Sequence, residues 1–306
     1  MLVTIVNACL RDGRGGSPTA VLEEASLTEL ERCQVPKLMG TSHAVFVSAD
    51  GGDLDRPLAS LRFFTATGEV PGCGHGTVAA LAFLAQNAGR DPYHVTLHAS
   101  ERSFAGEATR AGGHVSAAFD PGAVQVREAT VDERVAVLDA LGHDPNILVP
   151  EICVASLGRP RVLVPLSMPT AVAGLQPDYD RLRDACERLG LLGCFVHSVP
   201  TTEGRLSARM FAPSIGVPED IANANSTACL AARLVQRNMT RINVDMGDSL
   251  GSPATIIATT QPTHSGAQIR VGGAAKVIQT LRLERGELNR PRNTLRVGAT
   301  ARWMRR

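Results

Sequence analysis

The residues of this chain best suited to chemistry lie in two short turns that are far apart in the sequence. In the first turn, His75 stands between Gly74 and Gly76 and closely follows Cys73. An imidazole titrates near neutral pH and can therefore move a proton, and glycines on either side let a ligand approach the backbone. Asp220 occupies the corresponding region of the second turn. These residue types indicate acid–base chemistry on a small molecule.

Each turn belongs to a segment that occurs twice. The first segment, 62–84, runs through a strand-like stretch, a turn of small residues and an apolar stretch, and the second, 209–234, repeats that order. Phe64 and Phe211 stand at matching places, 211 − 64 = 147 residues apart, which is about half the chain. A repeat on this scale predicts two similar halves with one binding site in the crevice between them.

Simpler interpretations of the turn residues stay open. Thr77 and the polar residues 225–227 can serve only to cap the helices that follow them. The unpaired N–H groups at the start of those helices can also hold a carboxylate. Asp220 is favoured by the helix dipole alone, and a histidine in a loop is often structural. Cys73 fits either a thiol activated at a helix N-terminus or a buried inert thiol, and the inert thiol is the simpler interpretation.

The elements around these turns indicate the class of fold. The stretches 77–85 and 227–235 are apolar on almost every face, so helices there must be surrounded by protein. Many short strand-like stretches accompany them. We therefore predict an α+β fold of two pseudo-symmetric, mainly antiparallel β-barrels, each wrapped around a central α-helix. A doubly wound parallel sheet would need a regular alternation of strands and helices that is missing here.

The predicted halves are 1–125 and 130–283, and a tail at 284–306 is a candidate for completing the first barrel. Local signals predict further elements. Amphipathic helices are expected at Leu27–Gln34 and Tyr179–Leu189, the second with Asp178 as its start signal and Gly190 as its stop. Separate strands are expected at Gln268–Gly272 and Val277–Leu283.

The composition limits the class of function. The 306 residues are 44% hydrophobic and carry a net charge of +1, which argues against nucleic acid as the main partner. We find neither a signal peptide nor an apolar run of transmembrane length, so no membrane partner is expected. The seven cysteines include no CxxC pair, which is typical of free thiols in the cytoplasm. Without ligand-spaced His and Cys residues or a GxGxxG turn, we predict no metal, flavin or nicotinamide.

The two segments resemble those of a known family. Residues 64–77, FTATGEVPGCGHGT, are similar to the FTP…EVPFCGHAT signature of the phenazine-biosynthesis PhzF family. Residues 209–213, with Glu219, Asp220 and Ala222, resemble its R-x-FAP…EDPATGSA signature. Shorter segments resemble its GNPxAV, G-RPS and VGGxAV motifs, at 16–21, 249–253 and 271–277. The resemblance spans about residues 1–283 and implies a diaminopimelate-epimerase-like fold, a homodimer and proton transfer without a cofactor.

The chain also departs from the family pattern. His43 stands where the family's proton-carrying glutamate is expected, in the segment that begins at Ser42. Ala224 and Asn225 replace the Gly and Ser of the second turn, whereas His75 and Asp220 are retained. The resemblance thus implies three catalytic residues, His43, His75 and Asp220. The substrate-binding residues expected around them are Ser42, Cys73, Gly74, Gly76, Ala224, Asn225 and Ser226.

Three functions compete for this site. The first is a cofactor-independent isomerase that shifts a proton or double bond in a small unsaturated carboxylic or cyclic amino acid, in specialised-metabolite biosynthesis. The second is a two-thiol amino-acid racemase or epimerase, in which Cys73 is one thiol. Its partner should face it from the Asp220 turn, but the nearest cysteine, Cys229, lies in the helix body. The third is a non-catalytic protein that binds small acids. The sequence favours the isomerase.

Overall fold

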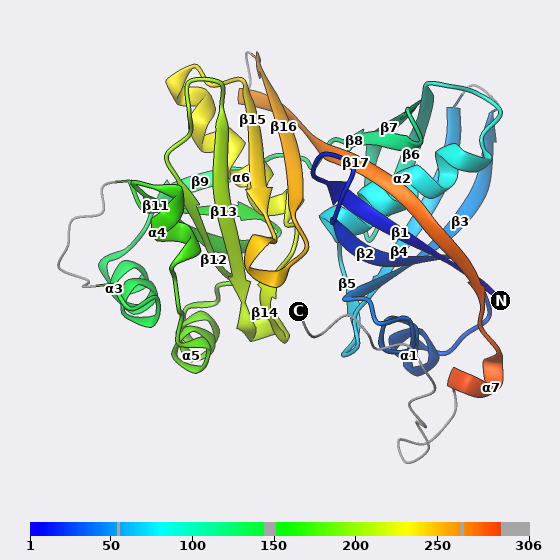
Figure 1. Ribbon diagram of the computed structural model, residues 1–306, viewed down its shortest axis with the longest axis horizontal. Helices are drawn as coiled ribbons and strands as arrows, with labels where there is room; N and C mark the ends of the chain where they lie inside the picture. The colour runs from blue at the N-terminus through cyan, green and yellow to red at the C-terminus, as the bar shows by residue number, and fades with distance from the viewer. Residues whose placement is uncertain (54–55, 144–150, 264–265, 289–306) are drawn as a thin grey trace.

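The computed structural model describes residues 1–53, 56–143, 151–263 and 266–288, and it forms two lobes side by side (Figure 1). The elements of the first half are β1 (Leu2–Leu10), β2 (Ser17–Glu23), α1 (Glu29–Met39), β3 (His43–Asp53), β4 (Arg56–Phe64), β5 (Glu69–Val70), α2 (Gly74–Asn87), β6 (Tyr93–Ala99), β7 (Arg102–Ala111) and β8 (His114–Phe119).

The second half repeats this succession, with an additional strand and a ten-residue helix at its start and a five-residue helix after its third strand. Its elements are β9 (Gln125–Glu128), α3 (Val131–Ala140), β10 (Cys153–Leu157), β11 (Arg159–Leu166), α4 (Pro169–Ala173), α5 (Tyr179–Leu189), β12 (Gly193–Ser198), β13 (Arg205–Ala212), β14 (Val217–Asp220), α6 (Ala224–Leu234), β15 (Arg241–Met246), β16 (Ala254–Thr263), β17 (Gly266–Arg282) and α7 (Arg285–Leu288).

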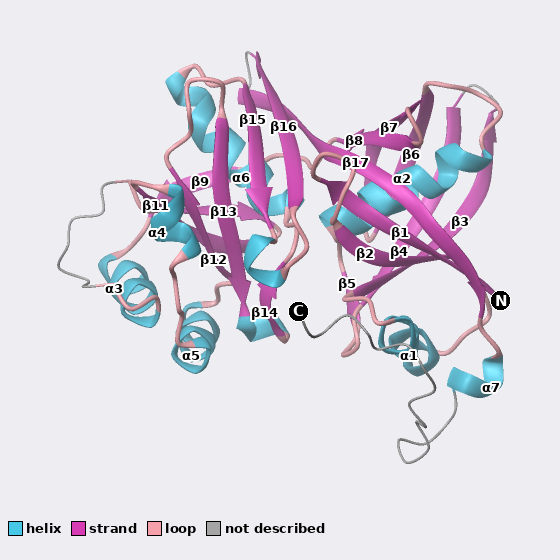
Figure 2. Cartoon of the chain, viewed as in Figure 1, coloured by secondary structure: helices cyan, strands magenta, loops and turns pink. Residues whose placement is uncertain are grey.

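The repeat in the sequence is also a repeat in the strand pairing. In the first half, β1–β2 is antiparallel, β2–β3 parallel, β3–β4 antiparallel, β4–β6 parallel, and β6–β7 and β7–β8 antiparallel. The same order of pairings runs through β10, β11, β12, β13, β15, β16 and β17. The expected α+β fold of two pseudo-symmetric, mainly antiparallel halves is therefore confirmed (Figure 2).

Strand β17 belongs to both halves. Its first part pairs with β16, and its later part pairs with β8 and β1, which closes the first half into a ring of strands. Figure 1 shows it running from the junction of the lobes across the first one. The boundaries 1–125 and 130–283 stay a prediction. In the structure the chain crosses from the second half to the first within a single strand, β17. Of the tail, 284–288 contains α7, and 289–306 lies outside the described residues.

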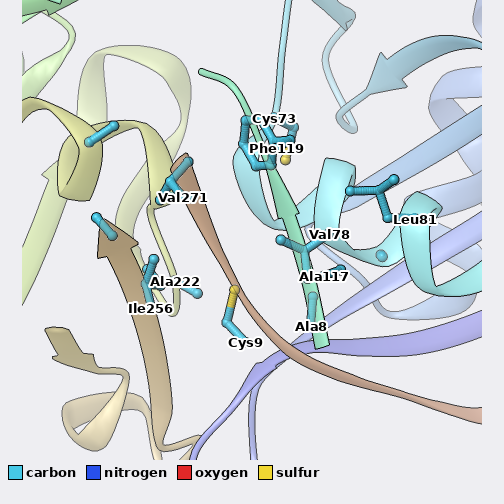
Figure 3. Packing of buried hydrophobic residues seen from close by; sticks show 14 of the residues in the cluster. Ala8, Cys9, Cys73, Val78, Leu81, Ala117, Phe119, Ala222, Ile256 and Val271 are labelled. Carbon is cyan, nitrogen blue, oxygen red and sulfur yellow. The ribbon is translucent and has the colours of Figure 1, made fainter. Parts of the chain in front are cut away.

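The strands of each half pack around an apolar helix. Helix α2 contacts β1, β2, β3, β4, β7, β8 and β17, and the side chains from Val78 to Ala82 are fully buried. Helix α6 contacts β9, β10, β15, β16 and β17. Both helices contribute to one continuous cluster of buried residues. Figure 3 shows members from both halves in this cluster, among them Val78, Ala222 and Ile256.

The amphipathic helices cover the outer faces of the strands. Alternation along the strands makes this possible, because in β3 the side chains of Val45 and Val47 join the inner cluster while Ala44 and Phe46 pack against α1. Helices α3 and α5 cover the outer face of the second half in the same way. None of the helices among the described residues is long and apolar enough to cross a membrane.

The helix signals are partly confirmed. Helix α5 begins after its cap Asp178 and ends at Gly190, as predicted. The predicted range Leu27–Gln34 is too short, because α1 starts after the capping box of Thr28 and continues through Pro36 to Met39. A proline within a helix removes one hydrogen bond, but the buried Cys33 and Val35 hold this turn against the strands.

The prediction of two separate strands at Gln268–Gly272 and Val277–Leu283 is wrong, because one strand, β17, spans them. The first predicted strand ends at Gly272, and Gly273 follows it. In the structure Gly272 instead allows close pairing with β8, since a Cβ atom on it would lie 1.9 Å from the carbonyl oxygen of Ala117. Here the missing side chain keeps the strand continuous.

We predict that Gly272→Ala lowers the free energy of unfolding by about 1–3 kcal/mol, the usual cost of forcing an extra methyl group into a packed region. The added Cβ would meet backbone atoms of β8, which cannot rotate away. Urea unfolding followed by circular dichroism measures the change. Gly89→Ala is the control, because a Cβ there meets nothing within 4 Å. Equal stability of the two variants would contradict the close approach of β17 to β8.

Candidate active site

The N-termini of the two central helices meet at the junction of the halves. A Cβ atom on Gly74, the first residue of α2, would lie 2.6 Å from the Cβ of Ala224, the first residue of α6. The residue before each helix caps it. Cys73 Sγ accepts from the Gly76 N–H at 3.4 Å, and Asn223 Oδ1 accepts from the Ser226 N–H at 2.9 Å. The two turns of the repeat therefore face each other, as the sequence predicts.

Two imidazoles and one thiol form a buried cluster at this junction. His43 begins β3, His75 lies in the first turn of α2, and Cys73 is the cap of α2. Their exposed fractions are 8%, 2% and 7%. The Nε2 atom of His75 lies 3.4 Å from Cys73 Sγ, and the two imidazole rings meet edge to face with their centroids 4.8 Å apart. We call His43, Cys73 and His75 the junction cluster.

Hydrogen bonds from outside the cluster orient both rings. The Nδ1 of His75 lies 3.0 Å from the carbonyl oxygen of Ala222, in the other half of the molecule. A carbonyl oxygen only accepts, so this Nδ1 carries the hydrogen, and the Nε2 of the neutral ring is left with a lone pair beside the Cys73 sulfur. The Nδ1 of His43 lies 3.0 Å from the Ser42 hydroxyl.

The cluster changes the acidity of its members. Burial alone raises the pKa of the Cys73 thiol, but the charges of His43 and His75 and their hydrogen bonds outweigh it and lower the pKa to about 5. Burial alone lowers the pKa of His75, but the adjacent Cys73 thiolate, Asp220 and the Ala222 carbonyl raise it to about 9. The two shifts favour a thiolate on Cys73 beside an imidazolium on His75. The simpler interpretation of Cys73 as an inert buried thiol does not match these surroundings.

Asp220 acts on His75 through its charge. The two residues form no direct pair, because the Ala222 carbonyl accepts from the His75 Nδ1. The Asp220 carboxylate accepts from the side-chain amide of Asn223 at 3.0 Å and from the Ala222 N–H at 3.4 Å. It thus holds the turn that presents the Ala222 carbonyl, and its negative charge raises the pKa of His75.

The residues predicted to bind substrate fall into two groups. Ser42, Cys73, Gly74, Ala224 and Asn225 lie at the junction, where Asn225 is half-buried. Gly76 and the side chain of Ser226 face the interior of their own halves. A Cβ on Gly76 would meet Val45, Phe63 and Cys73, and the Ser226 hydroxyl donates to the sulfur of Met210 at 3.4 Å.

Sequence reasoning missed Ala222 and Asn223. Ala222 contributes its backbone carbonyl. Every residue has this group, so the residue type gives no signal. Asn223 had a signal, because it precedes the apolar helix at the place where Cys73 precedes the first one.

The other thiols differ from Cys73. Cys229 is fully buried in the body of α6, and burial raises its pKa. Cys9, on β1, has a left-handed backbone with φ of 63°, which is unusual for a residue other than glycine. Burial raises the pKa of the Cys9 thiol, and so do the charges of Asp220 and Cys73. The charge of Cys73 thus affects the pKa of Cys9, whereas Cys229 lies in the helix body.

Comparison with known proteins places the chain. A family model described as phenazine biosynthesis-like protein matches residues 7–280. The uncharacterized isomerase YddE of Escherichia coli O157:H7 is 28% identical over 279 residues, 87% of this chain and 92% of that protein. The trans-2,3-dihydro-3-hydroxyanthranilate isomerase of Pseudomonas fluorescens is 27% identical over 261 residues, 79% of this chain and 84% of that protein.

A solved structure shows the same fold. The predicted epimerase from Pseudomonas aeruginosa has a TM-score of 0.77 and 24% identity, over 92% of this chain and 98% of that one. The two chains therefore share the overall fold. The chain belongs to the phenazine biosynthesis-like, or PhzF, family, which confirms the resemblance, and it is an enzyme of isomerase type.

We predict that the Cys73 thiolate forms as the pH rises through about 5, because the two imidazoles stabilise its charge. The difference in thiolate ultraviolet absorbance between the wild type and Cys73→Ser measures this titration. His75→Asn should move the midpoint to higher pH, whereas His94→Asn, on an exposed histidine, should leave it unchanged. A wild-type midpoint near the ordinary thiol value of about 8.5 would contradict the description of the cluster.

Proposed function

We propose that this protein is a cofactor-independent isomerase that moves a proton, and with it a double bond, in a small unsaturated carboxylic or cyclic amino acid. The observation that carries the proposal is the junction cluster, in which a buried thiol and two oriented imidazoles lie at the junction of the halves. The isomerase from Pseudomonas fluorescens acts on trans-2,3-dihydro-3-hydroxyanthranilate, which belongs to this substrate class. A role in specialised-metabolite biosynthesis, a homodimer and a cytoplasmic location remain predictions.

The carboxylate of the substrate is held by the starts of α2 and α6 in this proposal. The caps already use the N–H groups of Gly76 and Ser226. The N–H groups of Gly74 and Asn225 precede them and have no acceptor within their own helices. Both point from the positive end of a helix, where an anion is favoured. This arrangement places the acid beside the junction cluster.

The proton then moves through the imidazoles. His43 accepts a proton from one carbon of the substrate, the electron pair shifts along the double bond, and a proton returns to a different carbon. The Cys73 thiolate favours the positive charge that develops on His43. His75, held by the Ala222 carbonyl, stabilises that thiolate, and Asp220 supports the positive charge of His75. The net result is an isomer of the substrate with no change in oxidation state.

We predict that His43→Ala lowers the turnover by roughly 10²–10⁴, the usual contribution of one general acid–base group. The assay follows incorporation of deuterium from the solvent, with trans-2,3-dihydro-3-hydroxyanthranilate as the first substrate tested. His94→Ala is the matched control, because this histidine is exposed on β6. Near-normal turnover of His43→Ala would remove His43 from the mechanism.

A two-thiol epimerase is the second candidate function. It is favoured by the contrast between two cysteines near the junction, since the pKa of Cys73 is lowered and that of Cys9 is raised. At neutral pH the Cys73 thiolate would accept a proton and the Cys9 thiol would donate one. Exchange would then occur at a stereocentre without a shift of a double bond. A non-catalytic binding protein would give no exchange with any small acid.

The pH profile of Cys73→Ser separates the two enzymes. Under the isomerase proposal this variant retains turnover, but the alkaline limb of its profile moves to lower pH. The reason is that His75 loses the thiolate that raises its pKa, and burial, which lowers the pKa, remains. The measurement is turnover against pH for the wild type and Cys73→Ser. Complete loss of turnover in both Cys73→Ser and Cys9→Ser supports the two-thiol epimerase instead.

A further inference from the structure

We propose that the junction cluster is also a binding site for a borderline-soft divalent cation, with Zn²⁺ as the favoured ion. The ligands are the Cys73 sulfur and the Nε2 atoms of His43 and His75. This inference goes beyond the isomerase function and does not depend on it. The sequence predicts no metal site, because the three residues do not follow a spacing typical of metal-binding motifs. The fold brings them together.

The distances suit a small tetrahedral ion. The candidate ligand atoms of the three residues all lie within 4.8 Å of one another. Zinc bonds of about 2.0–2.1 Å to nitrogen and about 2.3 Å to sulfur place neighbouring ligands about 3.3–3.6 Å apart in a tetrahedron. The pair formed by Cys73 Sγ and His75 Nε2 already has this spacing, at 3.4 Å. The ligand atom of His43 lies within 4.8 Å of both.

The outer hydrogen bonds also match a metal centre. Histidines that bind a metal through one ring nitrogen commonly bond a carbonyl or hydroxyl through the other. His75 has this arrangement, with its Nδ1 on the Ala222 carbonyl, and the Nδ1 of His43 contacts the Ser42 hydroxyl. Both Nε2 atoms are therefore the nitrogens left for an ion.

The donor types select the cation. Two imidazoles and a thiolate suit Zn²⁺, Co²⁺ or copper, whereas Mg²⁺ and Ca²⁺ prefer oxygen ligands. Three protein ligands leave a fourth tetrahedral position for a small anion at the junction of the halves. Since the ion would occupy the lone pairs that accept protons, bound Zn²⁺ should inhibit any proton transfer by the cluster.

The test uses Co²⁺ and Zn²⁺ with the full-length protein after chelator treatment and dialysis. We expect one Co²⁺ per chain, with a sulfur-to-cobalt charge-transfer band and the intense visible bands of tetrahedral Co²⁺, and competition by Zn²⁺. Cys73→Ser should abolish the charge-transfer band. His75→Asn and His43→Asn should raise the Kd by more than about 10–100-fold, the cost of losing only an outer-shell partner.

These variants are chosen to preserve the fold. Serine keeps an acceptor at the cap of α2, and asparagine keeps a polar group near the Nδ1 position. The control is the double variant Cys33→Ser/His94→Asn, which changes the same residue types outside the cluster and should bind as the wild type does. Absence of a bound ion, or a charge-transfer band that survives in Cys73→Ser, would overturn the proposal.

X-ray absorption of the zinc-loaded wild type provides a second measurement that needs no variant. We expect one sulfur at about 2.3 Å and two imidazole nitrogens at about 2.0–2.1 Å. A shell made only of nitrogen and oxygen would also overturn the site.

Discussion

The close contact between Gly74 and Ala224 is the constraint on which the site depends. It exists because residue 74 has no side chain, since a Cβ there would lie 2.6 Å from the Cβ of Ala224. The approach lets the start of α2 meet the turn before α6, so that His75 reaches the Ala222 carbonyl at 3.0 Å. That hydrogen bond fixes the ring against the backbone of the other half. A bulkier residue at 74 would separate both helix ends and the hydrogen bond with them.

The charges at this contact stabilise one another. An isolated buried thiolate or imidazolium is costly, but a pair that is also hydrogen-bonded is tolerated. Cys73 gains from the N–H of Gly76, from the positive end of α2 and from the imidazoles. His75 gains from the thiolate, from Asp220 and from a carbonyl. The interactions that stabilise these two buried charges also hold a proton acceptor and a proton donor side by side.

A symmetric scaffold carries an asymmetric site. The caps of α2 and α6 have the same backbone role, but one is Cys73 and the other Asn223. The strands β3 and β12 match in the pairing pattern, yet β3 begins with His43 and β12 with Gly193, where a Cβ would lie 1.9 Å from the Phe211 carbonyl oxygen. The shared strand β17 ties the halves together, so the chemical groups of the first half meet the backbone of the second in one arrangement.

The sequence by itself determined the fold class, the central helices and the two turns that meet at the junction. Apolar residues on all faces require burial whatever surrounds them, and the repeated turns mark the ends that face each other. Local signals also placed α5, through Asp178 and Gly190. The continuity of β17 escaped prediction, because a glycine that ends a strand and one that admits a neighbouring strand look the same in a sequence. The roles within the site depend on contacts across the two halves. Only the tertiary structure decided that His75 bonds the Ala222 carbonyl instead of Asp220, and that Cys73 lies between two imidazoles, since both follow from distances between residues remote in the chain.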